Sequence, residues 1–247
     1  LNSRCEPLVI REFNEIGTSI NAMAKQLQET IRNEYELKLA QKNLQLQALQ
    51  SQIQPHFIIN TIYSFITLNQ IGEQEALNDA FYSFAHLLRY VLSRSRETTL
   101  GAELDFLNDY CSLCLLRFGN RLSYEINCSE EFKSLSMPKL LLQPLVENAI
   151  RYGADRNGIR TVMICACYAK DTYGHKCVHI AVKDNGKGFP KEMLEQFYCG
   201  ENGNRVGLKN VHERLKSIYG NESGLLLQNT QEGACVSFDI PEATYAE

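Results

Sequence analysis

The first hundred residues contain almost nothing that would end a helix. Pro7 and Pro55 are the only prolines in this stretch, and Gly17 and Gly72 are its only glycines. Apolar residues recur at steps of four and three, which is the spacing of an amphipathic face or a coiled-coil seam. This first apolar set consists of Ile16, Ile20, Met23, Leu27 and Ile31. The N-terminal part of the chain is therefore predicted to fold into long helices.

A second apolar set follows and is out of phase with the first by one residue around Tyr35. It consists of Leu39, Leu46, Leu49 and Ile53, with Lys42 in one seam position. Such a four-residue insertion is a stutter, which occurs in helical linkers that carry signals but also arises by accident. The segment 32–52 is rich in Gln, Glu, Lys and Leu, which favours a two-stranded parallel coiled coil. We therefore expect a homodimer.

A helical hairpin is predicted after Pro55. Apolar positions continue through 58–66, polar residues around Gly72 form a turn, and a second amphipathic stretch covers 76–92. Two such hairpins, one from each subunit, would form a four-helix bundle. A further helix is predicted over 101–117.

The pattern changes after Gly119, where short alternating or apolar runs are separated by turn residues. Strands are predicted at Leu122–Cys128, Thr161–Ala169, Val178–Val182, Gly224–Asn229 and Ala234–Ile240. Helices are predicted at Pro138–Tyr152 and Val206–Tyr219, and the segment from Pro190 to Gly203 is expected to be irregular. The C-terminal part is therefore predicted to be an α+β domain.

Charge and cysteine content exclude several classes of protein. The net charge is −4 and no basic block is present, so direct nucleic-acid binding is not expected. The nine cysteines are an odd number without the spacing of a disulfide framework, which indicates reduced thiols. Cys111 and Cys114 form a C-x-x-C one helical turn apart, and we interpret them as core residues rather than metal or redox groups.

No run approaches the roughly 20 apolar residues needed to span a bilayer, and no signal peptide is present. The chain begins with Leu1 rather than methionine. We therefore expect a fragment whose membrane anchor lies upstream.

The first chemically suggestive segment runs from Gln54 to Asn60. A neutral imidazole is a good phosphoryl acceptor near pH 7, and Asn60 lies on the same helical face as His56, where its amide can orient the ring or the incoming phosphate. The alternative is a histidine packed in the bundle. Continuing the coiled-coil seam by three residues from Ile53 places His56 in the core, whereas an acceptor must face solvent.

The second segment, Leu142–Gly153, places an acid, an amide and a cation close together on an otherwise apolar helix. Asn148 can supply an oxygen to Mg²⁺, which retains waters and substrate phosphates as its other ligands. Glu147 is a candidate base or a surface acid, and Arg151 can offset phosphate charge. The alternative is an ordinary amphipathic helix.

Two glycine-containing segments complete the set. In the segment 184–189, Asp184 ends a buried strand and can accept a hydrogen bond from an exocyclic amine such as that of adenine, although D-N-G is also typical of a tight turn. In the segment 203–211, glycines lead into a helix start, where free N–H groups favour phosphate. The segment 203–211 lacks the G-K-[ST] of a Walker loop, and the alternative interpretation is a plain helix cap.

The four segments in this order resemble the sensor histidine kinases of the LytS/YesM type. Pro55–Asn60 is similar to the family's P-H-F-[LF]-x-N phosphoacceptor segment, and Leu142–Ile150 matches its L-Q-P-L-V-E-N-A-I box. Asp184–Gly188 and Gly207–Leu215 match its D-N-G-x-G and G-L-x-N-V-x-x-R-L boxes. The N-terminal segment resembles the second helix of a HAMP module. The resemblance implies three regions: 1–31 as a partial HAMP-like helix, 32–118 as coiled coil and dimerisation helices, and 119–247 as a Bergerat-type (GHKL) ATP-binding domain.

The resemblance also implies a role for each matching position. His56 would be phosphorylated with Asn60 and Glu147 assisting, and Asn148 would hold Mg²⁺. The segment between Phe189 and Gly203 would be a flexible lid over ATP. The nucleotide would be bound by Asn148, Arg151, Tyr152, Asp184, Gly186, Gly188, Gly203, Arg205, Gly207 and Leu208.

Phosphate would then pass from the kinase to an aspartate of a response regulator, and the chain would be the cytoplasmic part of a bacterial membrane protein. Arg205 departs from the family pattern, which usually has glycine there, so the lid would be stiffer or Arg205 would touch phosphate. Two alternatives remain at this point. One is a dimeric scaffold that binds ATP without transferring it, and the other is a Bergerat-fold ATPase that hydrolyses ATP with water and a glutamate.

Overall fold

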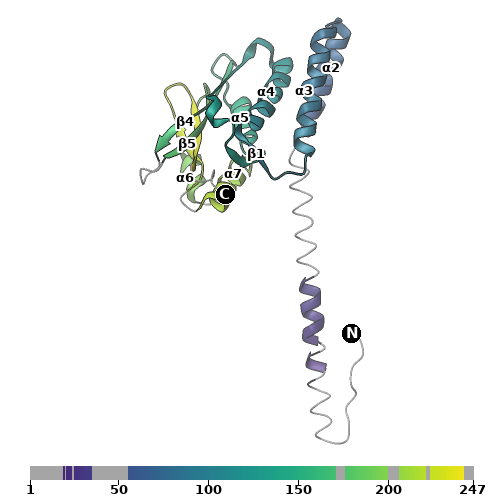
Figure 1. Ribbon diagram of the computed structural model, residues 1–247, viewed down its shortest axis with the longest axis vertical. Coiled ribbons are helices and arrows are strands. Elements are labelled where there is room, and N and C mark those ends of the chain that lie inside the picture. The colour runs from purple at the N-terminus through teal and green to yellow at the C-terminus, as the bar shows by residue number, and fades with distance from the viewer. Residues whose placement is uncertain are drawn as a thin grey trace, which may run out of the picture. The chain divides into compact units, whose positions relative to one another are not determined.

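The computed structural model describes residues 19, 21–23, 25–34, 55–170, 176–199, 206–220 and 223–241. The chain divides into two units, Leu1–Pro55 and His56–Glu247 (Figure 1). In the first unit, residues 25–34 are helical, and Met23, Leu27 and Ile31 are between 50% and 63% exposed. The helical prediction is confirmed there. The stutter around Tyr35 and the second apolar set lie outside the described residues.

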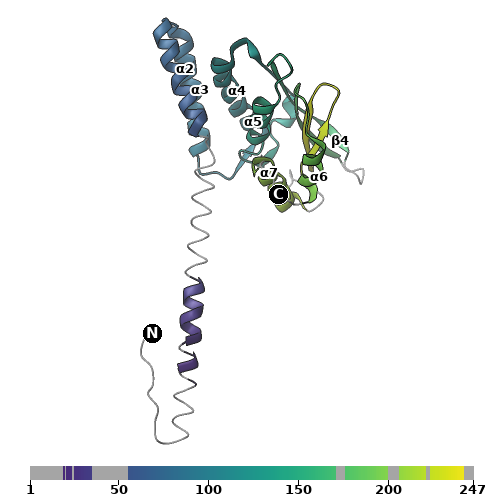
Figure 2. The ribbon, with the colours of Figure 1, turned by 180° about the vertical axis from the view of Figure 1, so that it is seen from behind.

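The second unit begins with the predicted helical hairpin. Helix α2 (Pro55–Ile71) and helix α3 (Gln74–Leu92) run antiparallel and lie side by side (Figures 1 and 2). Gly72 connects them with a φ of 78°, a backbone conformation that costs glycine little. Phe65 holds the two helices together through ring contacts with Phe81 at 4.6 Å and Phe84 at 5.6 Å.

Helix α4 (Leu100–Phe118) follows, with the Thr99 side chain capping its start by accepting from the Ala102 N–H at 3.3 Å. Strand β1 (Glu97–Thr99) directly precedes α4. It pairs antiparallel with the short strand β3 (Ser136–Pro138), which comes later in the chain. Two 3₁₀ turns, η1 (Gly119–Arg121) and η2 (Glu130–Phe132), lie between α4 and β3.

The C-terminal domain is a mixed five-stranded sheet in the order β2-β4-β5-β7-β6. Only β2 and β4 run parallel, and the other three pairs are antiparallel. The bounds are β2 (Leu122–Cys128), β4 (Arg160–Lys170), β5 (Lys176–Asp184), β6 (Leu226–Asn229) and β7 (Ala234–Pro241). All five strands predicted from the sequence are confirmed.

Helices α5 (Gln143–Tyr152) and α7 (Val206–Tyr219) contact each other, and α5 packs against β4 and β5 (Figures 1 and 2). The buried residues of the central strands alternate in β4 but are consecutive in β5 and β7. The largest of these are Val162, Ile164, Ile180, Val236, Phe238 and Ile240. The α+β expectation is therefore confirmed.

Two predicted segments differ from the structure. The helix expected from Pro138 begins at Gln143, because Pro138 ends β3 and Leu140 adopts a φ of 59°, a left-handed conformation that no helix can include. The segment expected to be irregular after Pro190 contains helix α6 (Lys191–Cys199).

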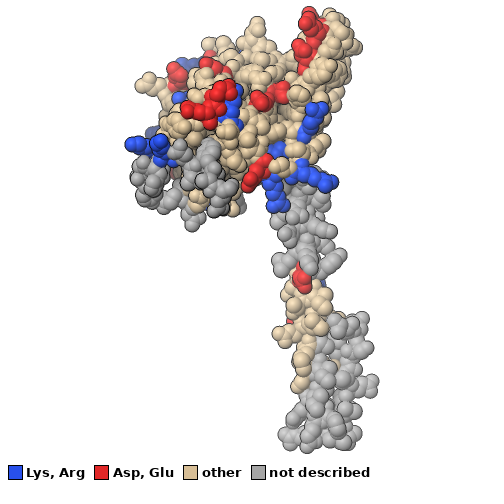
Figure 3. Space-filling view, in the orientation of Figure 1, with Lys and Arg blue, Asp and Glu red and all other residues tan. Residues whose placement is uncertain are grey.

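Among the described residues, every helix is too short or too polar to cross a membrane. Figure 3 shows acidic side chains at the turn of the hairpin and basic ones toward its other end, so the charge on this face is mixed.

Candidate ATP site and phosphoacceptor

Asp184 organises the loop that follows β5. Its Oδ1 accepts hydrogen bonds from the Gly186 N–H at 2.9 Å and the Ala234 N–H at 3.2 Å. Asn185 is also engaged, because its Oδ1 accepts from the Thr161 N–H at 2.7 Å. The D-N-G segment therefore forms a turn, which is the structure that this sequence typically adopts. The turn holds the Asp184 carboxylate at the end of a buried strand.

Three glycines allow the backbone to pack closely around Asp184. A Cβ on Gly153 would lie 2.5 Å from the Asp184 Cβ, and one on Gly186 would lie 2.7 Å from the Gly153 Cα. A Cβ on Gly233 would lie 2.1 Å from the Asp184 carbonyl oxygen. The end of α5 and the D-N-G loop are therefore in direct contact, which brings the second and third sequence segments together.

Asn229 fixes the other side of the same loop. Its Oδ1 accepts from the Phe189 N–H at 2.6 Å, and its Nδ2 donates to the Phe189 carbonyl at 2.9 Å. Gly188 beside it has a φ of 76°, where a Cβ would also meet the Asn229 side chain at 2.6 Å. Neither Asn229 nor Gly233 was predicted from the sequence as a site residue. A polar residue that ends a strand beside a D-N-G loop was the available signal for the former.

Helix α5 carries the polar residues predicted to hold phosphate and metal. Glu147 and Asn148 are half-buried, whereas Arg151 and Tyr152 are exposed, with the Arg151 guanidinium 5.3 Å from the Tyr152 ring centroid. Among the described residues, no group of three His, Cys, Asp or Glu side chains could hold a metal ion. A single amide oxygen from Asn148 nevertheless suits Mg²⁺, which takes most of its ligands from phosphates and water.

Helix α7 brings the fourth segment against α5. A Cβ on Gly207 would lie 3.7 Å from the Pro144 Cβ, and Leu208 is buried. Gly207 and Leu208 therefore lie near the start of the helix that carries Asn148. Gly203 and Arg205 lie outside the described residues.

His56 belongs to a second cluster at the start of α2. Its side chain is exposed, and the Asn60 Nδ2 lies 3.1 Å from Nδ1 and 3.3 Å from Nε2 of the ring. The seam-based expectation of a core position concerns burial against a second copy and stays a prediction.

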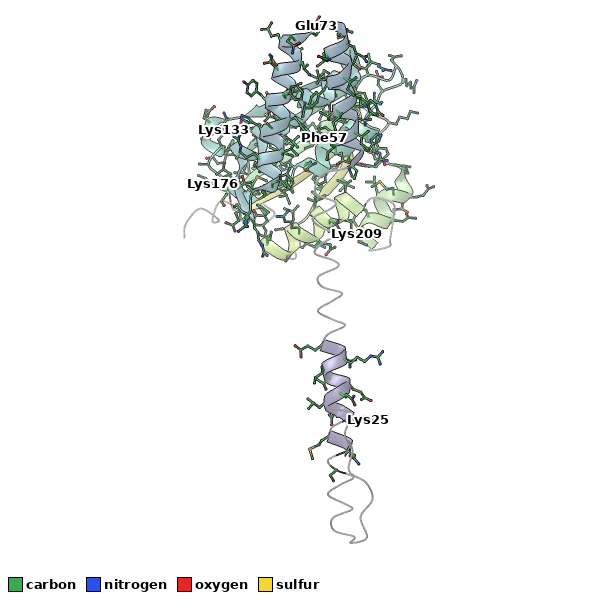
Figure 4. The ribbon with its side chains drawn as sticks, turned by 90° about the vertical axis from the view of Figure 1, so that its right-hand side faces the viewer. Lys25, Phe57, Glu73, Lys133, Lys176 and Lys209 are labelled. Carbon is green, nitrogen blue, oxygen red and sulfur yellow. The ribbon has the colours of Figure 1, made fainter. Side chains whose placement is uncertain are left out.

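Phe57, labelled in Figure 4, connects this second cluster to the C-terminal part of the unit. It stacks on Tyr110 of α4 with ring centroids 4.7 Å apart. Tyr110 is buried, and its pKa is raised well above the ordinary value by burial, with the Cys114 thiol and the Glu147 carboxyl adding to the shift. Tyr110 thus contacts the phosphoacceptor segment, and the Glu147 carboxyl of α5 is near enough to affect its pKa.

The two C-x-x-C thiols should be unreactive in the folded protein. Burial raises the pKa of the Cys114 thiol to about 12 and raises that of Cys111 as well. At pH 8 only about one Cys114 in 10⁴ is then a thiolate, which is the reactive form. We expect iodoacetamide to label the exposed Cys167 first and to reach Cys111 and Cys114 only on unfolding. Mass spectrometry of the peptides would check this, and early labelling of Cys111 would contradict it.

His212 of α7 should make the domain less stable in acid. It is buried, its Nδ1 accepts from the Leu225 N–H at 3.0 Å, and burial lowers its pKa. A histidine pKa lowered on folding contributes stability that is present above the unfolded value and is lost as pH falls through the folded value. We expect Tm to fall between pH 7 and pH 5, and to fall less in His212→Asn, whose amide can still accept from Leu225. An equal fall in both would contradict this.

The fold and the sequence together define a kinase-type ATP-binding protein. Residues 44–122 match the family model described as "Histidine kinase", and residues 136–244 match "Histidine kinase-, DNA gyrase B-, and HSP90-like ATPase". The chain belongs to the LytS/YesM family of sensor histidine kinases.

Two curated relatives illustrate the match. Sensor histidine kinase YesM of Bacillus subtilis is 31% identical over 93% of this chain and 39% of its own length. Sensor protein LytS of Oceanobacillus iheyensis is 30% identical over 95% of this chain and 42% of its own. The chain therefore spans about two fifths of the length of these relatives. Among solved structures, the histidine kinase domain of the Erythrobacter litoralis EL346 blue-light activated kinase covers 84% of this chain and 95% of its own, at 15% identity and a TM-score of 0.43.

Proposed function

We propose that this chain catalyses transfer of the γ-phosphoryl group of ATP to His56, and that the phosphoryl group then passes to an aspartate of a response regulator. One observation carries the proposal: His56 is exposed on α2, and the next residue, Phe57, stacks on Tyr110 of α4. The segment that carries the acceptor histidine is thus packed against α4, which also contacts strand β2 of the candidate ATP-binding domain.

Different elements of the candidate ATP site would bind different parts of the nucleotide. The Asp184 carboxylate is assigned to the adenine amine, because its turn is already fixed by Gly186 and Ala234. Asn148 is assigned as the protein ligand of Mg²⁺, which would neutralise phosphate charge during the transfer. Arg151 and Tyr152, together with Gly188, Gly207 and Leu208, would line the phosphate side, and Gly203 and Arg205 would belong to the lid.

At the acceptor, a ring nitrogen of neutral His56 forms the new N–P bond while the bond between the γ-phosphorus and its bridging oxygen breaks, and ADP leaves. The other ring nitrogen then loses its proton. Glu147 is assigned as the group that takes this proton, and Asn60 is assigned to orient the ring, as its amide already lies 3.1 Å from Nδ1.

A homodimer is proposed because the hairpin exposes several large apolar side chains, and contiguous apolar patches mark interaction surfaces. The large apolar residues on α2 and α3 that are between 46% and 73% exposed are Ile59, Ile62, Tyr63, Ile66, Ile71, Phe81, Tyr82 and Leu92. Packing against the same face of a second copy would bury them in a four-helix bundle. The HAMP-like segment 1–31, the region 32–118 and the ATP-binding region 119–247 are proposed as the three functional parts, with a sensor and a membrane anchor outside the chain.

The test is the chemistry of the label that forms when the chain is incubated with Mg²⁺ and γ-labelled ATP. Phosphohistidine is labile in acid and stable in base, so a label with these properties is expected. Bound ATP without any label would instead support a non-catalytic scaffold. Release of inorganic phosphate without labelled protein would support an ATPase, and a label stable in acid would place the phosphate on another type of residue.

A further inference from the structure

A fully buried carboxylate lies at the centre of the second unit. Glu103 of α4 has 0% of its surface exposed, and its oxygens accept from the Leu140 N–H at 2.9 Å and the Leu142 N–H at 3.1 Å. The Tyr90 hydroxyl also donates to it, and the Leu141 N–H contributes a further hydrogen bond. Burial raises the pKa of Glu103, and these hydrogen bonds oppose the rise. A buried carboxylate is tolerated only when donors surround it in this way.

The donors come from two different places in the fold. Tyr90 lies near the end of α3, so its hydroxyl attaches the hairpin to Glu103. The backbone N–H groups belong to the strap, residues 139–142, which leads directly into α5. The strap is held in an unusual shape, because Leu140 has a φ of 59°. A left-handed leucine persists only where its surroundings determine it, and Glu103 supplies that determinant.

Lys139 makes a second connection between the strap and α3. Its side chain is 6% exposed, and Nζ donates to the Ser93 Oγ at 2.8 Å, the Ser93 carbonyl at 3.1 Å and the Val91 carbonyl at 3.3 Å. These are the orphan carbonyls at the end of α3, where a cation is favoured. On the other side, the Arg214 guanidinium of α7 donates to the Lys139 carbonyl at 2.8 Å. The strap therefore contacts α3, α4 and α7 at once.

We propose that Glu103 is a positioning residue that couples the end of α3 to the ATP-binding helices α5 and α7. Because one carboxylate holds both Tyr90 and the strap, displacement of α3 would move the start of α5, and with it Asn148. The coupling concerns regulation of the ATP site, so it rests on the proposed function. Linkage is reciprocal, so a nucleotide that orders α5 must also order the end of α3.

The first test is amide hydrogen exchange of the full chain, with and without Mg²⁺ and a non-hydrolysable ATP analogue. In the wild type we expect the analogue to slow exchange in α5 and α7, and also about threefold in the last turns of α3. Tyr90→Phe removes the hydroxyl but keeps the ring on Phe106, with centroids 4.8 Å apart. In this variant, protection of α5 and α7 should remain and the effect on α3 should disappear. Tyr168→Phe, at a 54% exposed position on β4, is the control and should behave like the wild type.

Each outcome has a separate meaning. Absence of protection in α5 and α7 of the wild type would overturn ATP binding, and the coupling with it. Protection there without any effect on α3 would overturn the coupling alone. An effect on α3 that survives in Tyr90→Phe would show that the hydroxyl is not the connection, which also overturns the proposal.

Kinetics give a second, independent readout. Tyr90→Phe should lower kcat for self-phosphorylation about tenfold while the KM for ATP stays within about twofold, because the pocket itself is intact. Glu103→Gln should instead weaken binding of the analogue about tenfold, because its NH₂ group faces the N–H donors of the strap. Wild-type binding by a folded Glu103→Gln variant would contradict the proposal.

Discussion

Replacement of His56 by glutamine should remove the acid-labile phosphate, lowering it by about 10³-fold or more, because the side chain that accepts the phosphoryl group is gone. The exposed ring of His56 has the Asn60 amide as its hydrogen-bonding neighbour. Glutamine keeps a polar side chain with good helix propensity, so the free energy of unfolding should change by less than about 0.5 kcal/mol. The measurement is the label retained on the protein after incubation with Mg²⁺ and γ-labelled ATP.

The matched control is His86→Gln on α3. His86 is a second exposed histidine of the hairpin, and its Nδ1 lies 3.7 Å from Asp109. This variant should retain the full label, since His86 lies outside the proposed site. Binding of ATP should be the same in both variants. Equal label on His56→Gln and the wild type would mean that another residue is the acceptor.

Local pattern was enough to predict most of the C-terminal domain. Residues Leu122–Cys128 alternate with a period of two, and they form β2 with the predicted bounds. Helix α7 also has its predicted bounds, Val206–Tyr219. In both cases one face of the element is buried against a single neighbouring layer, so the hydrophobic period alone determines the element.

The segments that were missed depend on distant partners. Strands β1 and β3 have three residues each, and α4 lies between them in the sequence. Strands this short show no hydrophobic period from which they could be predicted. The N–H groups that Glu103 binds come 37 and 39 residues later in the chain. Two acids, Glu103 and Asp105, lie between Gly101 and Leu107, and only the strap distinguishes the buried Glu103 from the exposed Asp105. Helix α6 is short and follows Pro190, which made an irregular segment the better prediction.

For the site as well, local motifs could be predicted from the sequence, whereas contacts between distant residues could not. The D-N-G loop and the α5 box were recognised as motifs, and the structure adds the reason they work together, which is the contact between Gly153 and Asp184. The role of Asp184 as the residue that recognises adenine is still a proposal. It can be tested sharply, because one atom of its side chain can be changed while the loop is preserved.

Asp184→Asn should weaken ATP binding by roughly 30- to 100-fold, which corresponds to about 2–3 kcal/mol for a lost charge-assisted hydrogen bond in a buried site. The variant retains Oδ1, which can still accept from Gly186 and Ala234, so the loop should keep its conformation. The second oxygen becomes an NH₂ group, which cannot accept from the adenine amine. Calorimetric titration with Mg²⁺ and a non-hydrolysable ATP analogue would measure the change.

Guanine carries a carbonyl where adenine carries its amine, and the new NH₂ group can donate to that carbonyl. Asp184→Asn should therefore lose affinity for the ATP analogue while its affinity for the GTP analogue stays the same or rises, so the preference between the two bases narrows. Asp155→Asn is the matched control, since the Asp155 carboxylate also accepts two backbone N–H groups, from Asn157 and Ile159, each at 2.8 Å. Its affinity for both nucleotides should stay within about twofold of the wild type. Equal loss of both nucleotides by Asp184→Asn, together with a lower Tm, would show that Asp184 holds the loop rather than recognises the base.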